Sequence, residues 1–346
     1  MSCPTSVDRG SANATQGTRP LLTRRALAQL GLGWASSLCM GRLSSGHAQS
    51  AAPTVEPDGP DHLPRRRIQV LDTSISYIDA GTGEPVVFLH GNPTWSYQWR
   101  NIIPYLSPYR RCLAPDFVGM GWSGKSPTKA YRFVDQARYF DAWFDALGLT
   151  RNVTLVGHDW GGPTAFYRAR RFPDQIKAIA YFEAIVVPRR WADYAGGAAA
   201  RFRMLRSPEG ERRVLDENFF VEVVLPGGML RKLSDDEMEA YRAPYRDRDR
   251  RLPTLIWPRE LPIDGEPADV VAIVEKNAEW LKTSSNLPKL FINGDPGGAT
   301  SGRAREFLRT LPNQHEVTVK GTHHLQEDSP NEIGQALREF VLNLRT

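Results

Sequence analysis

The sequence predicts an α/β fold, in which helices cover a mostly parallel sheet. The main observation is that short apolar runs alternate with longer amphipathic segments from Arg67 onward. A second observation is the composition of the 346 residues, of which 41% are hydrophobic and 24% charged, with 29 Gly and 26 Pro. These values are typical of a globular chain and exclude disordered, collagen-like and polytopic membrane proteins. The length allows one large domain or two ordinary domains.

Eight short apolar runs are candidates for the strands of this sheet. In chain order they are Ile68–Leu71, Ile75–Ile78, Pro85–Leu89, Arg111–Ala114, Val153–Val156, Ile176–Phe182, Leu290–Asn293 and Glu316–Val319. Between the sixth and seventh runs, residues 188–283 show helical patterns such as Asp235–Tyr241 among many Arg and Pro residues. An insertion that leaves the carboxyl end of a strand can roof an active site, because ligands of such sheets bind at that edge. We therefore expect a core of residues 67–187 and 284–346 and a helical cap of residues 188–283.

The N-terminal segment predicts an export signal. Residues 1–50 contain the pair Arg24–Arg25, a weakly apolar run over Ala26–Met40 and small residues around Ala48–Ala52. This order resembles a twin-arginine signal, which would carry the folded protein to the periplasm or out of the cell. The apolar run is too short and too rich in Gly and Ser for a stable membrane anchor. A cytoplasmic protein with a disordered extension is the alternative. The Pro-rich residues 51–66 predict a linker.

Charge and cysteine content narrow the range of partners. The net charge is +5, and residues 1–50 hold five Arg and one Asp, so they account for +4 and leave +1 for the remainder. The nearly neutral remainder of the chain gives no reason to expect nucleic-acid binding, which needs a clustered basic face.

Two of the three cysteines, Cys3 and Cys39, lie in the predicted signal. A processed chain then has no disulfide partner for Cys112, which we expect to be a buried thiol.

The segment Val156–Gly162, which reads V-G-H-D-W-G-G, has the pattern of a nucleophile elbow with Asp159 at its centre. It follows the predicted strand Val153–Val156 and precedes a helical stretch, Pro163–Phe172. In such a turn the central side chain stands exposed at the end of the sheet and near a helix N-terminus. A carboxylate in this place displaces a leaving group from carbon and forms an ester, which must then be hydrolysed. Asp159 is therefore the candidate nucleophile.

Ester hydrolysis requires a general base, and the loop after the last predicted strand supplies two candidates, His323 and His324. The base in turn needs a carboxylate that orients it and stabilises its imidazolium form. Glu183 follows the sixth predicted strand, and Asp295 follows the seventh. The residue pattern alone leaves both pairs of alternatives open.

The segment Leu89–Trp95, which reads L-H-G-N-P-T-W, ends the third predicted strand, where a backbone donor of an oxyanion hole is expected. Asn92 in this segment would face the same pocket as Trp160. The indole N–H and the carboxamide NH₂ are both donors, so together they could hold an anion that leaves the attacked carbon. A halide fits this description.

The sequence resembles the haloalkane dehalogenases of the α/β-hydrolase superfamily, and within them the subfamily of hexachlorocyclohexane degradation. The resemblance extends from about Leu71 to Leu344 and includes the stretches His90–Thr94, Asp116–Gly121, His158–Gly161, Tyr181–Ala184 and Gln326–Pro330. It implies an eight-stranded sheet with a cap, with Asp159 as nucleophile, His323 as base and Glu183 as acid. It also implies that Asn92 and Trp160 hold the halide through their side chains and the oxyanion through their backbone N–H groups.

The resemblance extends to the cap, where Phe220 and Pro258 match positions that line the family's pocket. Gly228 stands where a bulkier residue is frequent at the tunnel mouth, which suggests a wide entrance. His324 departs from the family pattern, in which an aromatic or apolar residue follows the base. We expect a small haloalkane and water as substrates, no metal or organic cofactor, no nucleic-acid partner and a monomer.

Two other functions remain as alternatives. An epoxide hydrolase uses the same Asp and His but needs lid tyrosines as acids, for which Tyr194, Tyr241 and Tyr245 are candidates, and that family generally carries Phe at the position of Asn92. A catalytically silent binding protein is the second alternative, because a fold does not guarantee an activity.

Overall fold

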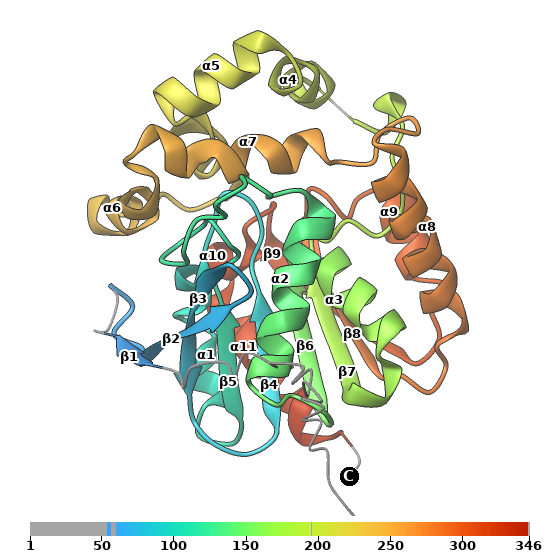
Figure 1. Cartoon of the computed structure of the whole chain (residues 1–346). Coiled ribbons are helices and arrows are strands. Elements are labelled where there is room, and N and C mark those ends of the chain that lie inside the picture. The colour runs from blue at the N-terminus through green and yellow to red at the C-terminus, as the bar shows by residue number, and fades with distance from the viewer. Residues whose placement is uncertain (1–53, 57–59, 195, 345–346) are drawn as a thin grey trace, which may run out of the picture. The chain divides into compact units, whose positions relative to one another are not determined.

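The computed structural model describes residues 54–56, 60–194 and 196–344, and its central element is a nine-stranded sheet (Figure 1). The strands are β1 (Thr54–Glu56), β2 (Arg65–Val70), β3 (Thr73–Ala80), β4 (Pro85–Leu89), β5 (Arg111–Pro115), β6 (Val153–His158), β7 (Ile176–Phe182), β8 (Lys289–Pro296) and β9 (Gln314–Gly321). All eight predicted strands are present as β2 to β9, and the predicted α/β class is confirmed. The predicted export signal, with Arg24–Arg25, lies outside the described residues. Within the described part of the chain, no helix is both long and apolar enough to cross a membrane.

The strand order is β1-β2-β3-β5-β4-β6-β7-β8-β9. The first three strands pair antiparallel along one side, and β3 also pairs antiparallel with β5. The remaining pairs, from β5 through β4 and β6 to β9, are parallel. The carboxyl ends of these six strands therefore meet at one edge of the sheet, which is where a ligand site is expected.

The region predicted as a linker, residues 51–66, contains a short strand and the start of another. Backbone groups of Thr54–Glu56 pair antiparallel with Arg65–Arg67, so β1 forms the outer edge of the sheet and β2 begins at Arg65. In the sequence, Pro53 and Pro57 stand on either side of β1 rather than within it. Proline is tolerated beside an edge strand because its missing N–H does not interrupt the ladder there. The linker prediction was therefore wrong for these residues.

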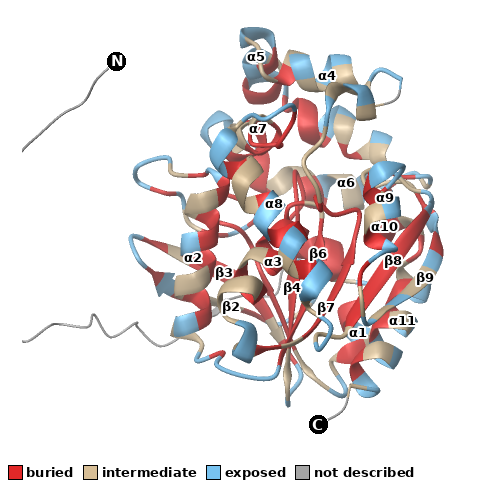
Figure 2. Cartoon of the chain, turned by 90° about the vertical axis from the view of Figure 1, so that its right-hand side faces the viewer, coloured by how far each residue is buried: buried red, intermediate tan, exposed pale blue. Residues whose placement is uncertain are grey.

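Helices cover both faces of the sheet, as Figure 1 shows. One face is covered by α1 (Ile103–Leu106), α10 (Leu325–Asp328) and α11 (Pro330–Leu342). The other face is covered by α2 (Phe133–Ala146), α3 (Gly161–Arg171), α8 (Ala268–Thr283) and α9 (Arg303–Leu308). Side chains alternate between the two faces along a strand, so Val86 and Phe88 of β4 pack on the first face and Val87 and Leu89 on the second. Figure 2 shows the resulting buried strands between the helical layers. Cys112 of β5 is fully buried, and its burial raises the pKa of the thiol to about 12.

The cap lies over the carboxyl edge of the sheet (Figure 1) and consists of short helices. Its α-helices are α4 (Ala198–Leu205), α5 (Pro208–Glu217), α6 (Asp235–Arg242) and α7 (Leu252–Arg259). The shorter helical turns of the chain are η1 (Ser96–Trp99), η2 (Pro173–Gln175), η3 (Trp191–Asp193), η4 (Phe220–Val224), η5 (Pro226–Gly228), η6 (Ala243–Tyr245) and η7 (Arg248–Arg251). A layer of buried side chains joins cap and core, with Trp160 and Phe133 below and Trp257 and Tyr245 above. Each such buried aromatic side chain contributes about 1.5–3 kcal/mol of hydrophobic free energy.

The structure places the end of the cap earlier than the predicted boundary at residue 283. Helix α8 lies beside α3 on the face of the sheet, and Leu281 belongs to the apolar cluster of that face. Val270, Val274, Ala278 and Leu281 are buried in α8 at helical spacing, so they form one apolar stripe. The amide of Asn277 also donates to the carbonyl oxygen of Pro163 at 3.4 Å. The C-terminal part of α8 therefore belongs to the helical layer of the core, whereas Val270 and Val274 lie in the cluster that joins cap and core.

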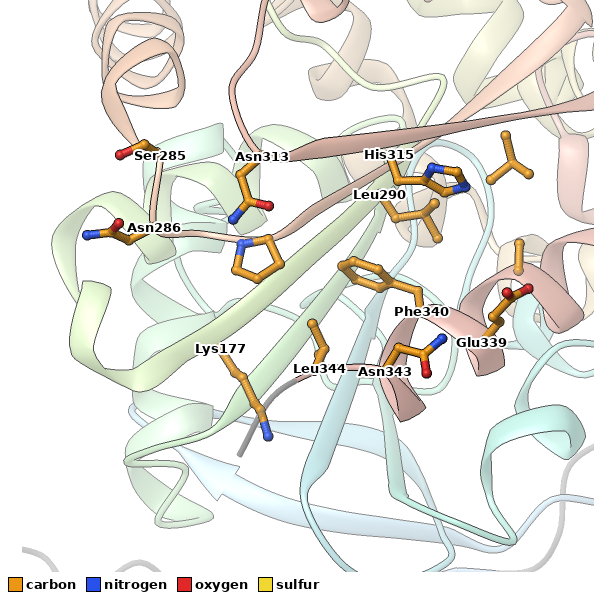
Figure 3. Close-up of a pocket in the computed structure, with 13 residues that line it drawn as sticks. Lys177, Ser285, Asn286, Leu290, Asn313, His315, Glu339, Phe340, Asn343 and Leu344 are labelled. Carbon is orange, nitrogen blue, oxygen red and sulfur yellow. The ribbon is translucent and has the colours of Figure 1, made fainter.

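A cavity of about 770 Å³ opens at the amino ends of β7, β8 and β9 (Figure 3). Its lining includes Lys177 from β7, His315 from β9 and Phe340 from α11. None of the residues predicted for the catalytic site lines it, and it lies at the edge of the sheet opposite to the strand ends that carry them.

Candidate active site

Asp159 lies in the turn between β6, which ends at His158, and α3, which begins at Gly161. Its backbone φ is +52°, a left-handed conformation that costs a residue with a side chain about 1–3 kcal/mol. The turn is also tight, because a Cβ atom at Gly161 would lie 2.1 Å from the carbonyl oxygen of Leu89. The structure thus has the predicted elbow, and it leaves the Asp159 side chain 14% exposed at the carboxyl edge of the sheet.

His323 lies between two carboxylates. Its Nδ1 atom is 3.2 Å from Oε2 of Glu183, and its Nε2 atom is 3.6 Å from Oδ2 of Asp159. The three side chains come from the ends of different strands: Asp159 follows β6, Glu183 follows β7 and His323 follows β9. Asp295, the alternative acid, is exposed near the end of β8. The structure therefore brings Glu183, and not Asp295, to the imidazole.

Several donors surround the Glu183 carboxylate, which is fully buried. The backbone N–H of Gly298 and the hydroxyl of Thr300 donate to it at 3.1 and 2.8 Å, and the backbone N–H of Ala299 also donates. Burial alone would raise the pKa of Glu183, but the hydrogen bond from His323 and the donors from Gly298 and Thr300 hold that pKa below its usual value. Glu183 is therefore a negative charge fixed beside the imidazole.

The two carboxylates also change the pKa of His323. Burial would lower the pKa of the imidazole, but its hydrogen bond to Glu183 and the charges of Asp159 and Glu183 outweigh burial and raise it. Asp159 shows the opposite balance, because burial raises the pKa of its carboxyl although His323 and two backbone N–H groups lower it. The site thus stabilises an imidazolium at His323.

Two further imidazoles flank His323. The ring centroids of His158 and His324 each lie 4.9 Å from the centroid of His323. Burial lowers the pKa of both flanking rings well below the usual value, and the charge of His323 adds to this effect. Nε2 of His158 lies 2.9 Å from the backbone oxygen of His323, to which it donates as the N–H tautomer. Of the three imidazoles, His323 is the one whose nitrogens face carboxylates.

These three histidines are also the group of described residues that could hold a metal ion, since one ring nitrogen from each lies within 4.8 Å of the others. Each ring already makes a hydrogen bond: His323 to Glu183, His158 to a backbone oxygen and His324 to Gln326. These bonds use one nitrogen of each ring and leave the other nitrogen of each ring outside them.

Backbone N–H groups of Asn92 and Trp160 hold the Asp159 carboxylate. The N–H of Asn92 donates to Oδ1 at 2.8 Å, and the N–H of Trp160 also donates to the carboxylate. The side-chain amide of Asn92 donates one of its two N–H groups to the carbonyl oxygen of Thr254 in α7, at 3.2 Å. The other remains for a ligand. The Trp160 ring is buried between Phe133 and Trp257, with centroid distances of 5.7 and 4.6 Å.

The cap residues singled out in the sequence lie in different surroundings. Phe220 in η4 packs in an apolar cluster within the cap that includes Leu215 and Leu255. Pro258 is buried in α7, next to Trp257. Gly228 lies against residues 322–328, which carry the base His323 and which we call the base loop. A Cβ atom at Gly228 would stand 2.8 Å from Cδ2 of His324. This contact argues against the wide entrance expected from the glycine alone, because the His324 ring occupies the adjacent space.

The hydroxyl groups of two lid tyrosines are already bonded elsewhere. Tyr245 donates to the backbone oxygen of Thr94 at 3.3 Å, and Tyr241 donates to Glu327. Both rings are buried, so turning either hydroxyl toward a substrate would leave its present acceptor without that bond. Tyr194 packs between Trp191 and Phe202 in the cap.

A backbone connection between cap and base loop was missed by sequence reasoning. The carbonyl oxygen of Gly228 accepts hydrogen bonds from the N–H groups of His323 and His324, at 3.0 and 2.8 Å. The carboxylate of Asp328 accepts from the N–H of Leu230 at 2.8 Å and from the N–H of Arg231 at 3.0 Å. The loop that carries His323 is therefore held by the cap.

A group of charged side chains, which we call the clamp, strengthens this connection. It consists of Arg100, Arg231, Glu237 and Glu327. Arg100 donates to both oxygens of the fully buried Glu327 at 2.6 and 2.8 Å and to Glu237 at 2.8 Å. The hydrogen bonds from Arg231 lower the pKa of Glu237 to about 2. Glu327 lies four residues after the base, but its main partner Arg100 is 227 residues away, so no local signal in the sequence indicated the clamp.

Comparisons with known proteins agree with this fold. Residues 84–330 match the family model of the alpha/beta hydrolase fold. The chain is 49% identical over 285 residues to a haloalkane dehalogenase from Sphingobium indicum, covering 81% of this chain and 96% of that relative. It is 42% identical over 281 residues to the coelenterazine h 2-monooxygenase of Renilla reniformis, covering 80% and 90% of the two chains. The crystal structure of the haloalkane dehalogenase DbeA from Bradyrhizobium elkani matches with a TM-score of 0.78 at 43% identity, covering 81% of this chain and 98% of that one.

The sheet, the elbow and the family match together define an α/β-hydrolase with an aspartate at the nucleophile position. Within that fold, the chain belongs to the haloalkane dehalogenase family. The family expected from the sequence motifs is thereby confirmed.

Proposed function

We propose that the protein hydrolyses carbon–halogen bonds of small haloalkanes through a covalent alkyl ester on Asp159. The observation that carries this proposal is the arrangement around one carboxylate. Asp159 accepts the N–H of Asn92 on one oxygen, while its other oxygen faces His323, which is paired with Glu183. A carboxylate held in this way can attack carbon and afterwards, as an ester, be attacked by water next to a base.

In the first half of the reaction, an oxygen of Asp159 attacks the carbon that bears the halogen. The new carbon–oxygen bond forms as the carbon–halogen bond breaks. The electron pair of the carbon–halogen bond leaves with the halide. The free N–H of the Asn92 amide and the indole N–H of Trp160 are the donors that stabilise this growing negative charge. The product of this half is an alkyl ester and a halide ion.

In the second half, His323 removes a proton from water, which attacks the ester carbonyl carbon. The backbone N–H groups of Asn92 and Trp160 stabilise the negative oxygen of the tetrahedral intermediate, because they already contact this carboxylate. Glu183 stabilises the imidazolium. The ester bond then breaks, and the leaving alkoxide takes the remaining proton of the attacking water, so that an alcohol leaves and Asp159 is again a carboxylate. The proton on His323 passes to solvent.

The decisive experiment measures bromide release by the full chain from 1-bromobutane and 1,2-dibromoethane, with Asp159→Ala as the blank. We expect bromide from the native protein and none from the blank. Diol formation from styrene oxide is measured in parallel, because an epoxide hydrolase would need lid-tyrosine hydroxyls, and those of Tyr241 and Tyr245 are bonded to Glu327 and Thr94. Light emission with coelenterazine h tests the activity named for the Renilla relative. Diol or light without bromide would replace the proposed function, and no reaction at all would favour the silent binding protein.

A second experiment tests the roles of Asp159 and His323. In the variant His323→Phe, the base is lost while the nucleophile stays, so we expect the reaction to stop at the ester. Intact mass after incubation with 1-bromobutane should increase by one butyl group, and peptide mapping should place that group on Asp159. An unmodified mass would contradict the assignment of the two residues.

A further inference from the structure

The base loop and the oxyanion loop are joined by a buried chain of polar side chains. The oxyanion loop is the segment Gly91–Thr94, whose Asn92 N–H contacts Asp159. In this chain, the hydroxyl of Thr94 donates to Oε1 of Gln98 at 2.7 Å, and Nε2 of Gln326 donates to the same oxygen at 3.1 Å. Nε2 of Gln326 also lies 3.4 Å from Nδ1 of His324. Thr94, Gln98 and Gln326 are fully buried, and His324 is 1% exposed.

The hydrogen bonds along this chain have compatible donors and acceptors, while Nε2 of Gln98 and Oε1 of Gln326 are buried without a hydrogen-bond partner among the described residues. The two N–H groups of the Gln326 amide serve Gln98 and His324, so Nδ1 of His324 must be the acceptor and its Nε2 must carry the proton. The N–H of Gly91 approaches the Thr94 hydroxyl at 3.4 Å, which extends the chain into the backbone beside Asn92. Buried polar networks with consistent partners fix the position of the segments that they join.

His324 also touches the cap. Its ring lies against Gly228, whose carbonyl oxygen accepts the N–H groups of both His323 and His324. The two loops and the cap are therefore connected through the side chain of His324.

We propose that His324 is a positioning residue. Through the chain His324–Gln326–Gln98–Thr94 it fixes the position of the base His323 relative to the oxyanion donor at Asn92. This inference rests on the proposed function. Formation of the ester needs Asp159 and the halide donors but not the base. Its hydrolysis needs the base and the oxyanion donors at the same time. A small displacement of one loop against the other should therefore slow hydrolysis much more than ester formation, because ester formation depends on Asn92 but not on its distance from His323.

Three variants separate the contributions of His324. His324→Phe keeps a ring over Gly228 but removes the acceptor nitrogen. His324→Asn places an acceptor oxygen near the position of Nδ1 and removes the rest of the ring. Gln98→Leu breaks the chain at its centre and leaves both His324 and Gly228 in place. The matched control is His315→Phe, which makes the same change at an exposed histidine of β9.

Rapid-quench measurements with 1,2-dibromoethane give the two rates separately, since bromide reports ester formation and the alcohol reports ester hydrolysis. We expect His324→Phe and Gln98→Leu each to slow hydrolysis about tenfold or more, with ester formation within about twofold of the native rate. Their double variant should be no slower than the slower single variant, because both break the same chain. His324→Asn should restore most of the hydrolysis rate, and His315→Phe should match the native protein.

Other results would overturn the inference. Equal slowing of both steps would indicate a general structural role for His324, and independent effects in the double variant would show that the chain does not act as a unit. An Asn variant as slow as the Phe variant would assign the effect to ring packing, and unchanged rates in all variants would leave His324 without a role. If the native protein formed neither bromide nor ester, the proposed function would have failed rather than this inference.

Discussion

Asp159 and Glu183 occupy equivalent places in the sheet, yet their surroundings suit them to different tasks. Each follows the end of a strand, and the two strands are in register at the preceding pair, His158 and Phe182. Both residues have a positive φ, +52° and +48°. Glu183 is fully buried among donors, which favours a permanent charge, whereas Asp159 retains some exposure and a raised pKa. The first arrangement suits a partner for an imidazolium, and the second suits a nucleophile.

The raised pKa of His323 predicts the pH dependence of ester hydrolysis. The imidazole must be neutral to accept a proton, so the hydrolysis rate should fall as the pH decreases through the pKa of His323. In the ester the charge of Asp159 is gone, and the hydrogen bond and charge of Glu183 are what raise this pKa. In Glu183→Gln the negative charge is lost, so the pKa of His323 should decrease and the acid limb should move to lower pH. The maximal rate should also fall, by about 10²–10⁴-fold, because the imidazolium loses its stabilising partner. Single-turnover hydrolysis across pH checks this, and an acid limb that stays in place would contradict it.

How far the sequence predicts the catalytic residues depends on how local their signals are. The elbow around Asp159 is a contiguous pattern after a buried strand, so it could be found in the sequence. The choice between Glu183 and Asp295 could not be made from spacing, because both follow strands at the same edge. It depends on the path of the base loop, which leaves Asp295 exposed and brings Glu183 within 3.2 Å of His323.

At the scale of elements, the turn η5 and the base loop act as one unit. The carbonyl oxygen of Gly228 holds the backbone of His323 and His324, and the His324 ring covers the glycine. Gly228→Leu should therefore displace His324 and lower the turnover of 1-bromobutane and of a bulky substrate such as bromocyclohexane by similar factors. A loss restricted to the bulky substrate would instead place residue 228 at an entrance.

The clamp predicts a stability effect that a surface ion pair would not give. Glu327 is fully buried, and its loss in Glu327→Gln leaves Arg100 and Arg231 with Glu237 as their shared carboxylate. We expect the free energy of unfolding to decrease by about 1–3 kcal/mol, because hydrogen bonds to a buried charged group are lost. The control Glu209→Gln changes an exposed partner of Arg212 and should leave the free energy of unfolding nearly unchanged. Urea unfolding followed by fluorescence compares the two, and equal small effects would contradict the role of the clamp.

The elements themselves were predictable to different degrees. Strands such as β6 and β7 are contiguous apolar runs in the sequence, and the structure has them within a few residues of the predicted bounds. Strand β1 and the assignment of the C-terminal part of α8 to the core were not predictable, because each depends on a partner elsewhere in the chain. The clamp is a similar case: Arg100 is 227 residues from Glu327 and 137 from Glu237.

At the scale of the whole molecule, the N-terminal segment predicts where the protein acts. If residues 1–50 are a twin-arginine signal, fusing them to a reporter that must fold before export should place the reporter in the periplasm. Replacing Arg24 and Arg25 by Lys should abolish this export, because that pathway depends on the arginine pair. Cell fractionation gives the result, with Arg9→Lys and Arg19→Lys as the charge-matched control. Retention of the unmodified fusion in the cytoplasm would favour the disordered extension.

The contacts between cap and base loop also predict what happens when the cap is exchanged between related proteins. A cap inserted between β7 and β8 looks like a module that could be transplanted to alter substrate preference. In this protein, however, Gly228 and Arg231 contribute hydrogen bonds to the very loop that carries His323. In a chimera that replaces the cap but keeps residues 322–328, these hydrogen bonds would be lost. We expect such a chimera to have a new pocket and a misplaced His323. We therefore expect a cap exchange to keep the activity only when residues 322–328 are exchanged together with the cap.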